Sequence, residues 1–333
     1  MAIREPEIIR NKEQMRNWTR SMRAQGKTIG LVPTMGYLHQ GHLSLISEAR
    51  KHAQLIVVSI YVNPAQFAAN EDLSTYPSDF QGDIEKLQST PNVVDVVFNP
   101  YDLYDRGEEK ERSGEEKKKK KKKKKREKDG GIVSCLEDER GGGFGHETWI
   151  RVEGLEKGMC GKSRPVFFRG VATVVAKLFN IIEPDVAVFG KKDYQQWRII
   201  QQMVRDLDFA VKVIGSEIIR DEDGLAMSSR NVHLSPKERE QALSISRSLI
   251  EAKSYANKGK KLCSELRKSV IDSIETAGGK IDYVEIVDQE SLEEVEEITN
   301  GGVVMCVAAW FGKVRLIDNM EIDISECVLG SVW

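Results

Sequence analysis

Cysteine is scarce in this chain of 333 residues, and the five that occur are scattered. None of them forms a CxxC pair and their number is odd, so the sequence indicates neither a disulfide framework nor a zinc site. Sparse, unpaired cysteine is typical of proteins of the reducing cytosol. We therefore expect a cytosolic protein.

Long apolar runs are also absent. No stretch reaches the roughly 18 uninterrupted apolar residues that a membrane span requires, so we expect no membrane partner. The first residues carry charges at Arg4, Glu5 and Glu7, where a secretory signal would need an apolar core. We therefore expect no such signal.

The chain as a whole also lacks a surplus of positive charge, although one segment of it is strongly basic. The formal net charge is −2, yet residues 117–128 hold eleven basic side chains against one glutamate. That segment therefore carries +10 and the remainder of the chain −12. An acidic body argues against nucleic acid as the main partner.

The basic segment lies within a glycine-containing region at about 105–145 that includes nine consecutive lysines. Like charges repel, and the region has almost nothing to bury. We expect a disordered insertion here. A nuclear-localisation or anion-binding role is the open alternative.

The length of the chain suits two domains, and its first two-thirds alternates strand-like and helical patterns. Strands are expected at 28–33, 54–62, 93–98, 185–189 and 211–214, and helices at 41–53, 79–88, 171–182 and 193–206. Such alternation predicts an α/β domain with a parallel sheet covered on both faces. Sheets of this kind bind ligands at the carboxyl ends of their strands.

The last third of the chain changes character. Ser235 and Glu238 form a capping box, with proline at the first helical position, which predicts a helix to about Ala256. A second helix near 262–276 and strands at 281–287, 303–309 and 314–318 complete a small α+β unit. We place the boundary near Ile218, which gives domains of residues 1–218 and 219–333.

The strongest local signal is PTMGYLHQGH at residues 33–42, where a predicted strand passes into a helix. Gly36 and Gly41 allow close approach of the backbone, and a helix N-terminus favours phosphate. His39 and His42 can lie on one face and, as hydrogen-bond donors, offset charge on a departing pyrophosphate. The alternative is two capping or core histidines in an ordinary turn.

GKKDYQQ at residues 190–196 marks a second junction of strand and helix. A lysine at this point can reach phosphates, Asp193 can cap the helix, and Gln196 can point into the crevice. The same letters are also an ordinary polar helix start. Gln66, at the end of another strand, could bind a hydroxy acid together with Gln196 or simply satisfy loop backbone.

DGLAMSSRN at residues 223–231 opens the second predicted domain. Two hydroxyls and an arginine on a loop preceded by glycine would make a mobile phosphate clamp. A turn with a helix cap explains the same residues equally well.

Five segments in this order resemble the signature segments of the pantothenate synthetases, the pantoate–β-alanine ligase family. They are PTMGYLHQGH, YVNPAQF, RPVFFRGVATVVAKLFN, FGKKDYQQ and DGLAMSSRN. The resemblance is closest to the plant branch and covers essentially the whole chain outside the lysine-rich insertion. It implies a Rossmann-like nucleotidylyltransferase domain and a smaller C-terminal α+β lid domain.

The resemblance also implies a reaction. The carboxylate of pantoate would attack ATP, accompanied by Mg²⁺, to give pantoyl adenylate and pyrophosphate. β-Alanine would then convert the adenylate to pantothenate and AMP. A homodimer is implied as well, while the protein ligands of Mg²⁺ and of the β-alanine carboxylate stay unassigned.

Roles follow from the resemblance residue by residue. His42 would be the catalytic histidine, and Gln66 and Gln196 would hold pantoate, with Arg164 near the phosphates or substrate. The groups that offset charge would be His42, His39, Lys192, Ser228, Ser229 and Arg230. The ATP contacts would be Met35, Gly36, Tyr37, Leu38, His39, Gln40, Gly41, His42, Gly190, Lys191, Lys192, Asp193, Ile219, Met227, Ser228, Ser229 and Arg230.

Three positions depart from the family pattern. Lys191 stands where many members have glutamate, and Phe167 where many have histidine. Gly82 precedes Asp83 where some members carry an acidic pair. Two rival functions stay open: an adenylyltransferase of the same superfamily acting on another small substrate, and a binding protein that uses the lysine tract to engage acidic partners.

Overall fold

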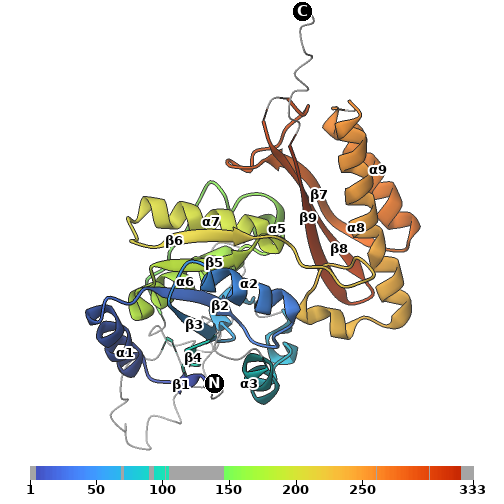
Figure 1. Cartoon of the computed structure of the whole chain (residues 1–333). Coiled ribbons are helices and arrows are strands. Elements are labelled where there is room, and N and C mark those ends of the chain that lie inside the picture. Colours follow the sequence, from blue (N-terminus) through green and yellow to red (C-terminus); the bar gives the residue numbers. More distant parts are fainter. Residues whose placement is uncertain are drawn as a thin grey trace, which may run out of the picture.

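The computed structural model describes residues 5–68, 71–89, 94–101, 103–104, 146–259, 261–299 and 301–323. Within these residues the chain forms a six-stranded sheet followed by a three-stranded sheet, each with its own helices (Figure 1). The lysine-rich insertion predicted at about 105–145 lies outside the described residues.

The six-stranded sheet is parallel throughout and has the order β1-β4-β3-β2-β5-β6. Its strands are β1 (Glu7–Ile9), β2 (Ile29–Thr34), β3 (Leu55–Ile60), β4 (Val96–Phe98), β5 (Val186–Gly190) and β6 (Lys212–Ser216). The prediction of a parallel α/β sheet is confirmed. The strand order reverses between β2 and β5, so the carboxyl ends of these two strands flank the crevice where such sheets bind ligands.

Both faces of the four inner strands are buried, which explains why these strands are almost continuously apolar. On β2, Leu31 packs into one core cluster and its neighbour Val32 into another, because side chains alternate across a strand. One face is covered by α2 (Gln40–Arg50) and α3 (Phe80–Gln88). The other is covered by α1 (Lys12–Ala24), α6 (Phe167–Ile182) and α7 (Tyr194–Asp206).

Several predicted elements need correction. The sequence did not indicate β1, α1 or the short helix α5 (Met159–Ser163). β1 has only three residues, two of them exposed, and α1 buries little beyond Met15 and Thr19. Helix α6 begins four residues before the predicted start, because its first two aromatic residues are themselves core. Val93, predicted to begin β4, lies outside the described residues.

The C-terminal unit consists of two helices on an antiparallel sheet of order β7-β8-β9. Its elements are α8 (Pro236–Asn257), α9 (Cys263–Thr276), β7 (Lys280–Asp288), β8 (Val303–Phe311) and β9 (Val314–Ile322). The predicted capping box is present: Ser235 accepts from the Glu238 backbone, and Glu238 from that of Ser235. The domain boundary at 218/219 stays a prediction.

The two faces of this small sheet have different neighbours. On β8, Met305 and Val307 pack against α8 and α9, while Val304 and Cys306 pack with Tyr194 of α7 in the first unit. The helices cover the outer face (Figure 1). The inner face therefore joins the two units through an apolar contact. No helix within the described ranges combines the length and apolar content needed to cross a membrane.

Candidate active site

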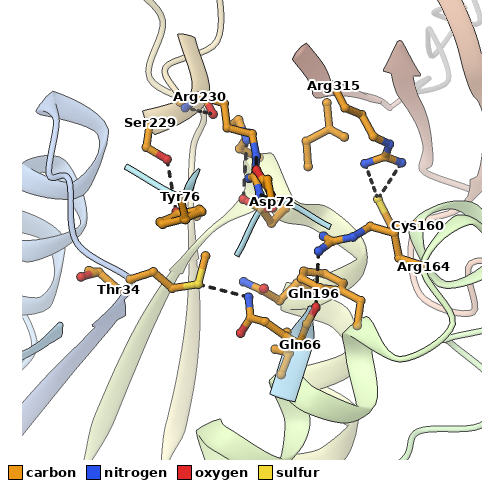
Figure 2. Close-up of a pocket in the computed structure, with 18 of the residues that line it drawn as sticks. Thr34, Gln66, Asp72, Tyr76, Cys160, Arg164, Gln196, Ser229, Arg230 and Arg315 are labelled. Carbon is orange, nitrogen blue, oxygen red and sulfur yellow. Dashed lines mark hydrogen bonds and ion pairs between the residues drawn. The ribbon is translucent and has the colours of Figure 1, made fainter. Parts of the chain in front are cut away.

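A cavity of about 1380 Å³ lies between the two units, at the carboxyl ends of β2, β3 and β5 (Figure 2). Residues 217–219 and 227–230 line it from the connection to the second unit, and residues of β9 line it from the small sheet. Pockets for drug-sized ligands have volumes of about 300–1,000 Å³. This cavity can therefore hold a nucleotide together with a small acid.

The turn between β2 and α2 is held by a carboxylate from α3. Gly36 and Tyr37 both have left-handed backbone, with φ of 87° and 53°. The buried Asp83 accepts hydrogen bonds from the N–H groups of Tyr37 at 2.8 Å and Leu38 at 2.6 Å. Left-handed backbone costs a non-glycine residue about 1–2 kcal/mol, so these bonds stabilise a strained turn.

His39 and His42 both cap α2 and line the cavity, so the two interpretations of this motif hold together. His39 Nδ1 accepts from the Gly41 N–H at 3.1 Å, and His42 Nδ1 accepts from the His39 N–H at 3.2 Å. The ring centroids are 4.1 Å apart. Because Nδ1 is the acceptor in each ring, the proton of the neutral imidazole lies on Nε2, which can donate to a ligand.

Electrostatics keep both imidazoles neutral at pH 7. Burial, reinforced by the charge of Lys192, lowers the pKa of His39 from 6.5 to about 4. Burial and the neighbouring His39 lower the pKa of His42 to about 3. The site therefore presents two neutral N–H donors rather than two imidazolium cations.

The residues after β5 divide between the cavity and the second unit. Lys192 and Gln196 line the cavity. Lys191 instead pairs with Glu217 at 2.7 Å and with Glu321 of β9 at 2.8 Å. Asp193 occupies the N-cap position of α7 but makes no capping bond with its side chain, and its carboxylate lies 3.7 Å from the Lys192 ammonium.

Gln66 belongs to a buried amide network at the end of β3. Its Oε1 accepts from Asn63 Nδ2 at 3.0 Å, and its Nε2 donates to the Met35 sulfur at 3.3 Å. Asn63 also donates to the Gly170 carbonyl and accepts from the Tyr104 hydroxyl. Asn63 was not selected from the sequence, because its contacts with Gly170 and Tyr104 join segments that are distant along the chain.

Two of the arginines that line the cavity are held by two acidic residues that are consecutive in the sequence. Arg230 makes two hydrogen bonds to the Asp72 carboxylate, at 2.9 and 3.2 Å. Arg164 makes two to Glu71, at 2.7 and 2.8 Å. Burial opposes the charge of Asp72, but Arg230 holds the pKa of that carboxyl below its usual value. Both acids lie far from their arginines along the chain, so local sequence patterns did not indicate them.

The segment after residue 226 faces the same cavity. Ser228 caps the short 3₁₀ helix η5 (Ser229–His233) by accepting from the Arg230 N–H at 3.3 Å. The Ser229 hydroxyl lies 3.2 Å from that of Tyr76. The predicted turn with a cap and the predicted phosphate clamp are therefore compatible uses of one segment.

Most of the residues selected from the sequence meet in this cavity. Those that line it are Met35, His39, Gly41, His42, Gln66, Arg164, Gly190, Lys192, Asp193, Gln196, Ile219, Met227, Ser228, Ser229 and Arg230. Those that do not are Gly36, Tyr37, Leu38, Gln40 and Lys191. Their roles toward ATP and substrate stay predictions.

A parallel sheet whose switch point opens into a large cavity lined by histidine, lysine and arginine side chains defines the class of nucleotide-binding α/β proteins. The family model for pantoate-beta-alanine ligase matches residues 7–321. The pantoate–β-alanine ligase of Lotus japonicus is 63% identical over 319 residues, which are 96% of this chain and 99% of the relative. That of Oryza sativa subsp. japonica is 64% identical, over 97% and 98%.

Solved structures agree with this. Pantothenate synthetase from Thermus thermophilus matches with a TM-score of 0.78 at 34% identity, covering 96% of this chain and all of that one. The Francisella tularensis pantoate–β-alanine ligase, complexed with "Beta-gamma ATP and Beta-alanine", has a TM-score of 0.69 at 31% identity, over 96% and 99%. The chain belongs to the pantoate–β-alanine ligase family, and its plant-like character is confirmed.

Proposed function

We propose that this chain condenses pantoate with β-alanine and uses ATP to do so, through a pantoyl-adenylate intermediate. One observation carries the proposal. Two neutral imidazoles and Lys192 face a cavity that the Ser228–Arg230 segment lines from the connection to the second unit. Family membership supports the reaction, and the relative solved with an ATP compound and β-alanine supports these substrates.

The first half-reaction would form the adenylate. The pantoate carboxylate attacks the α-phosphorus of ATP in line, a new P–O bond forms, and the bond to pyrophosphate breaks. Gln66 and Gln196 would orient pantoate by neutral hydrogen bonds. The Nε2–H groups of His39 and His42, with the Lys192 ammonium, would stabilise charge on the departing pyrophosphate.

The second half-reaction would form the amide. β-Alanine attacks the acyl carbon as its free amine, a C–N bond forms, and the C–O bond to AMP breaks while nitrogen loses a proton. The reactive acyl phosphate must be kept from water in the meantime. The position of the cavity between the two units supports such shielding.

Mg²⁺ would enter with ATP as part of the substrate. Asp83 is engaged by backbone N–H groups, and Asp72 and Glu71 by arginines. Among the described residues no group of three or more His, Cys, Asp or Glu side chains could hold a metal ion. We propose that the phosphates and water coordinate it, and that the enzyme acts as a homodimer in the cytosol, as the family resemblance implies.

Exchange of labelled pyrophosphate into ATP tests the proposal. We expect exchange with purified protein to require pantoate and to proceed without β-alanine, because labelled pyrophosphate enters ATP by reversal of the adenylation step, in which β-alanine takes no part. Added β-alanine should then release AMP and the amide. Exchange that is independent of pantoate, or an adenylate that β-alanine does not consume, would favour the adenylyltransferase alternative.

A further inference from the structure

Asn319 of β9 ties the small sheet to the loop that carries Lys192. Its side-chain Nδ2 donates to the carbonyl of Lys191 at 2.8 Å and to that of Lys192 at 3.0 Å. The side chain is almost fully buried. Both of its N–H groups are therefore used to fix the backbone from which the Lys192 ammonium reaches the cavity.

The preceding residue, Asp318, holds a hairpin at residues 219–227. This hairpin leads into the Ser228–Arg230 segment on the opposite side of the cavity. Its carboxylate accepts two hydrogen bonds from Arg220, at 2.6 and 3.0 Å, and Arg220 also donates to the Gly224 carbonyl. The hairpin closes with the Met227 N–H on the Ile219 carbonyl at 3.0 Å. Ser228 follows directly.

The geometry of a strand explains how neighbouring residues reach two different segments. Side chains alternate across a sheet, so Asp318 and Asn319 point to opposite faces. Asp318 stands opposite Val307, which packs with the helices, and Asn319 stands opposite Cys306, which packs against the first unit. The ladder between β8 and β9 fixes the spacing of the two side chains.

We propose that Asp318 and Asn319 are positioning residues, which set Lys192 and the Ser228–Arg230 segment at the separation that a triphosphate requires. Neither residue needs to touch a ligand, and neither lines the cavity. Displacing a charge-stabilising group by about 1 Å can cost about a hundredfold in rate. The inference rests on the proposed function, because that function puts phosphates between these two segments.

The test compares the isosteric variants Asn319→Asp and Asp318→Asn with Leu316→Ala, a buried residue of the same strand whose side chain packs in the helical core. Asn319→Asp cannot donate to the carbonyls, and Asp318→Asn loses the charge paired with Arg220. We expect both to weaken binding of a non-hydrolysable ATP analogue and to slow pantoate-dependent exchange by about ten- to a hundredfold. The reaction of preformed pantoyl adenylate with β-alanine should change less than about threefold, because the departing pyrophosphate takes no part in it.

Leu316→Ala should lower the melting temperature and leave analogue binding unchanged. In a Lys192→Ala background, Asn319→Asp should have less than about a twofold further effect on exchange, because it acts through that lysine. The role of Asn319 would be overturned if Asn319→Asp bound the ATP analogue as tightly as the wild-type protein does. It would also be overturned if the effects of Asn319→Asp and Lys192→Ala on the exchange rate simply multiplied. Absence of exchange in the wild-type protein would instead reject the proposed function on which the inference rests.

Discussion

The two histidines of the β2–α2 turn show how a single side chain serves both fold and chemistry. In each ring Nδ1 accepts a backbone N–H, which orients the imidazole and places the proton on Nε2. Burial then keeps that ring neutral. A neutral N–H donor needs no protonation at pH 7 to act on a phosphate oxygen.

Replacing His42 separates these two uses. In His42→Asn the amide oxygen can replace Nδ1 as acceptor for the His39 N–H, while the donor at Nε2 is lost. We expect pantoate-dependent exchange to fall by at least about a hundredfold with little change in melting temperature. His42→Gln, whose amide can replace Nε2–H, should recover part of the activity. Near-normal exchange in His42→Asn would contradict the assignment.

The pH dependence of stability follows from the same histidines. Their pKa values of about 4 and about 3 lie below the unfolded value of 6.5. Between pH 6.5 and these lower pKa values, the histidines bind more protons in the unfolded chain than in the folded one. The stability that the neutral histidines contribute is therefore fully present above pH 6.5 and is lost as the pH falls. We expect a loss on the order of 1 kcal/mol or more per histidine by pH 4. Urea unfolding from pH 7 to 4 checks this, and His39→Asn/His42→Asn should flatten the profile.

At the level of elements, helix α3 supports the turn between β2 and α2. Asp83 reaches across from this helix to Tyr37 and Leu38. Asp79 of the same segment caps α3 by accepting from the Gly82 N–H at 2.9 Å and does not line the cavity. The two carboxylates therefore form a natural pair for comparison.

Asp83→Ala should therefore impair both stability and nucleotide binding. Loss of two hydrogen bonds to a buried carboxylate is expected to cost about 2–3 kcal/mol of unfolding free energy and to weaken ATP binding about tenfold, as the turn relaxes. Asp79→Ala should cost about 1 kcal/mol through the lost cap and leave ATP binding intact. Denaturant unfolding and calorimetric titration measure the two effects. If Asp83→Ala and Asp79→Ala weakened ATP binding equally, the hydrogen bonds that Asp83 accepts from the turn would have no special role in binding.

In the molecule as a whole, the two units meet through an apolar cluster and an ion pair. Tyr194 packs with Val304 and Cys306, and its hydroxyl donates to Glu321 at 3.2 Å. The same carboxylate pairs with Lys191. Contacts outside the cavity therefore set how its two sides face each other.

A charge swap tests this contact. Lys191→Glu places a third carboxylate beside Glu217 and Glu321, and we expect it to lower the unfolding free energy on the order of 1 kcal/mol. Adding Glu321→Lys should restore part of that loss. Lys51→Glu, in the exposed pair with Glu48, is the matched control and should change little. The coupling energy of the double-mutant cycle decides the outcome, and a value near zero would contradict the expectation.

Local patterns along the chain were enough to predict the class of fold and the segments that form the site. Apolar runs separated by helical patterns predict a parallel sheet because each element must bury a face. Glycines and capping residues mark where strands pass into helices, and ligand sites lie at those junctions. His39, His42, Lys192, Gln66 and the clamp after residue 226 could be selected in this way.

The partners that orient those residues became known from the folded chain alone. Asp72, Asp83 and Asn319 act on groups many positions away, and local patterns carry no information about contacts between distant segments. The structure also directed Lys191 toward Glu321 and its neighbour Lys192 toward the cavity, although both were predicted to contact ATP. The neutral state of the histidines likewise depends on burial, which arises only when distant segments pack together.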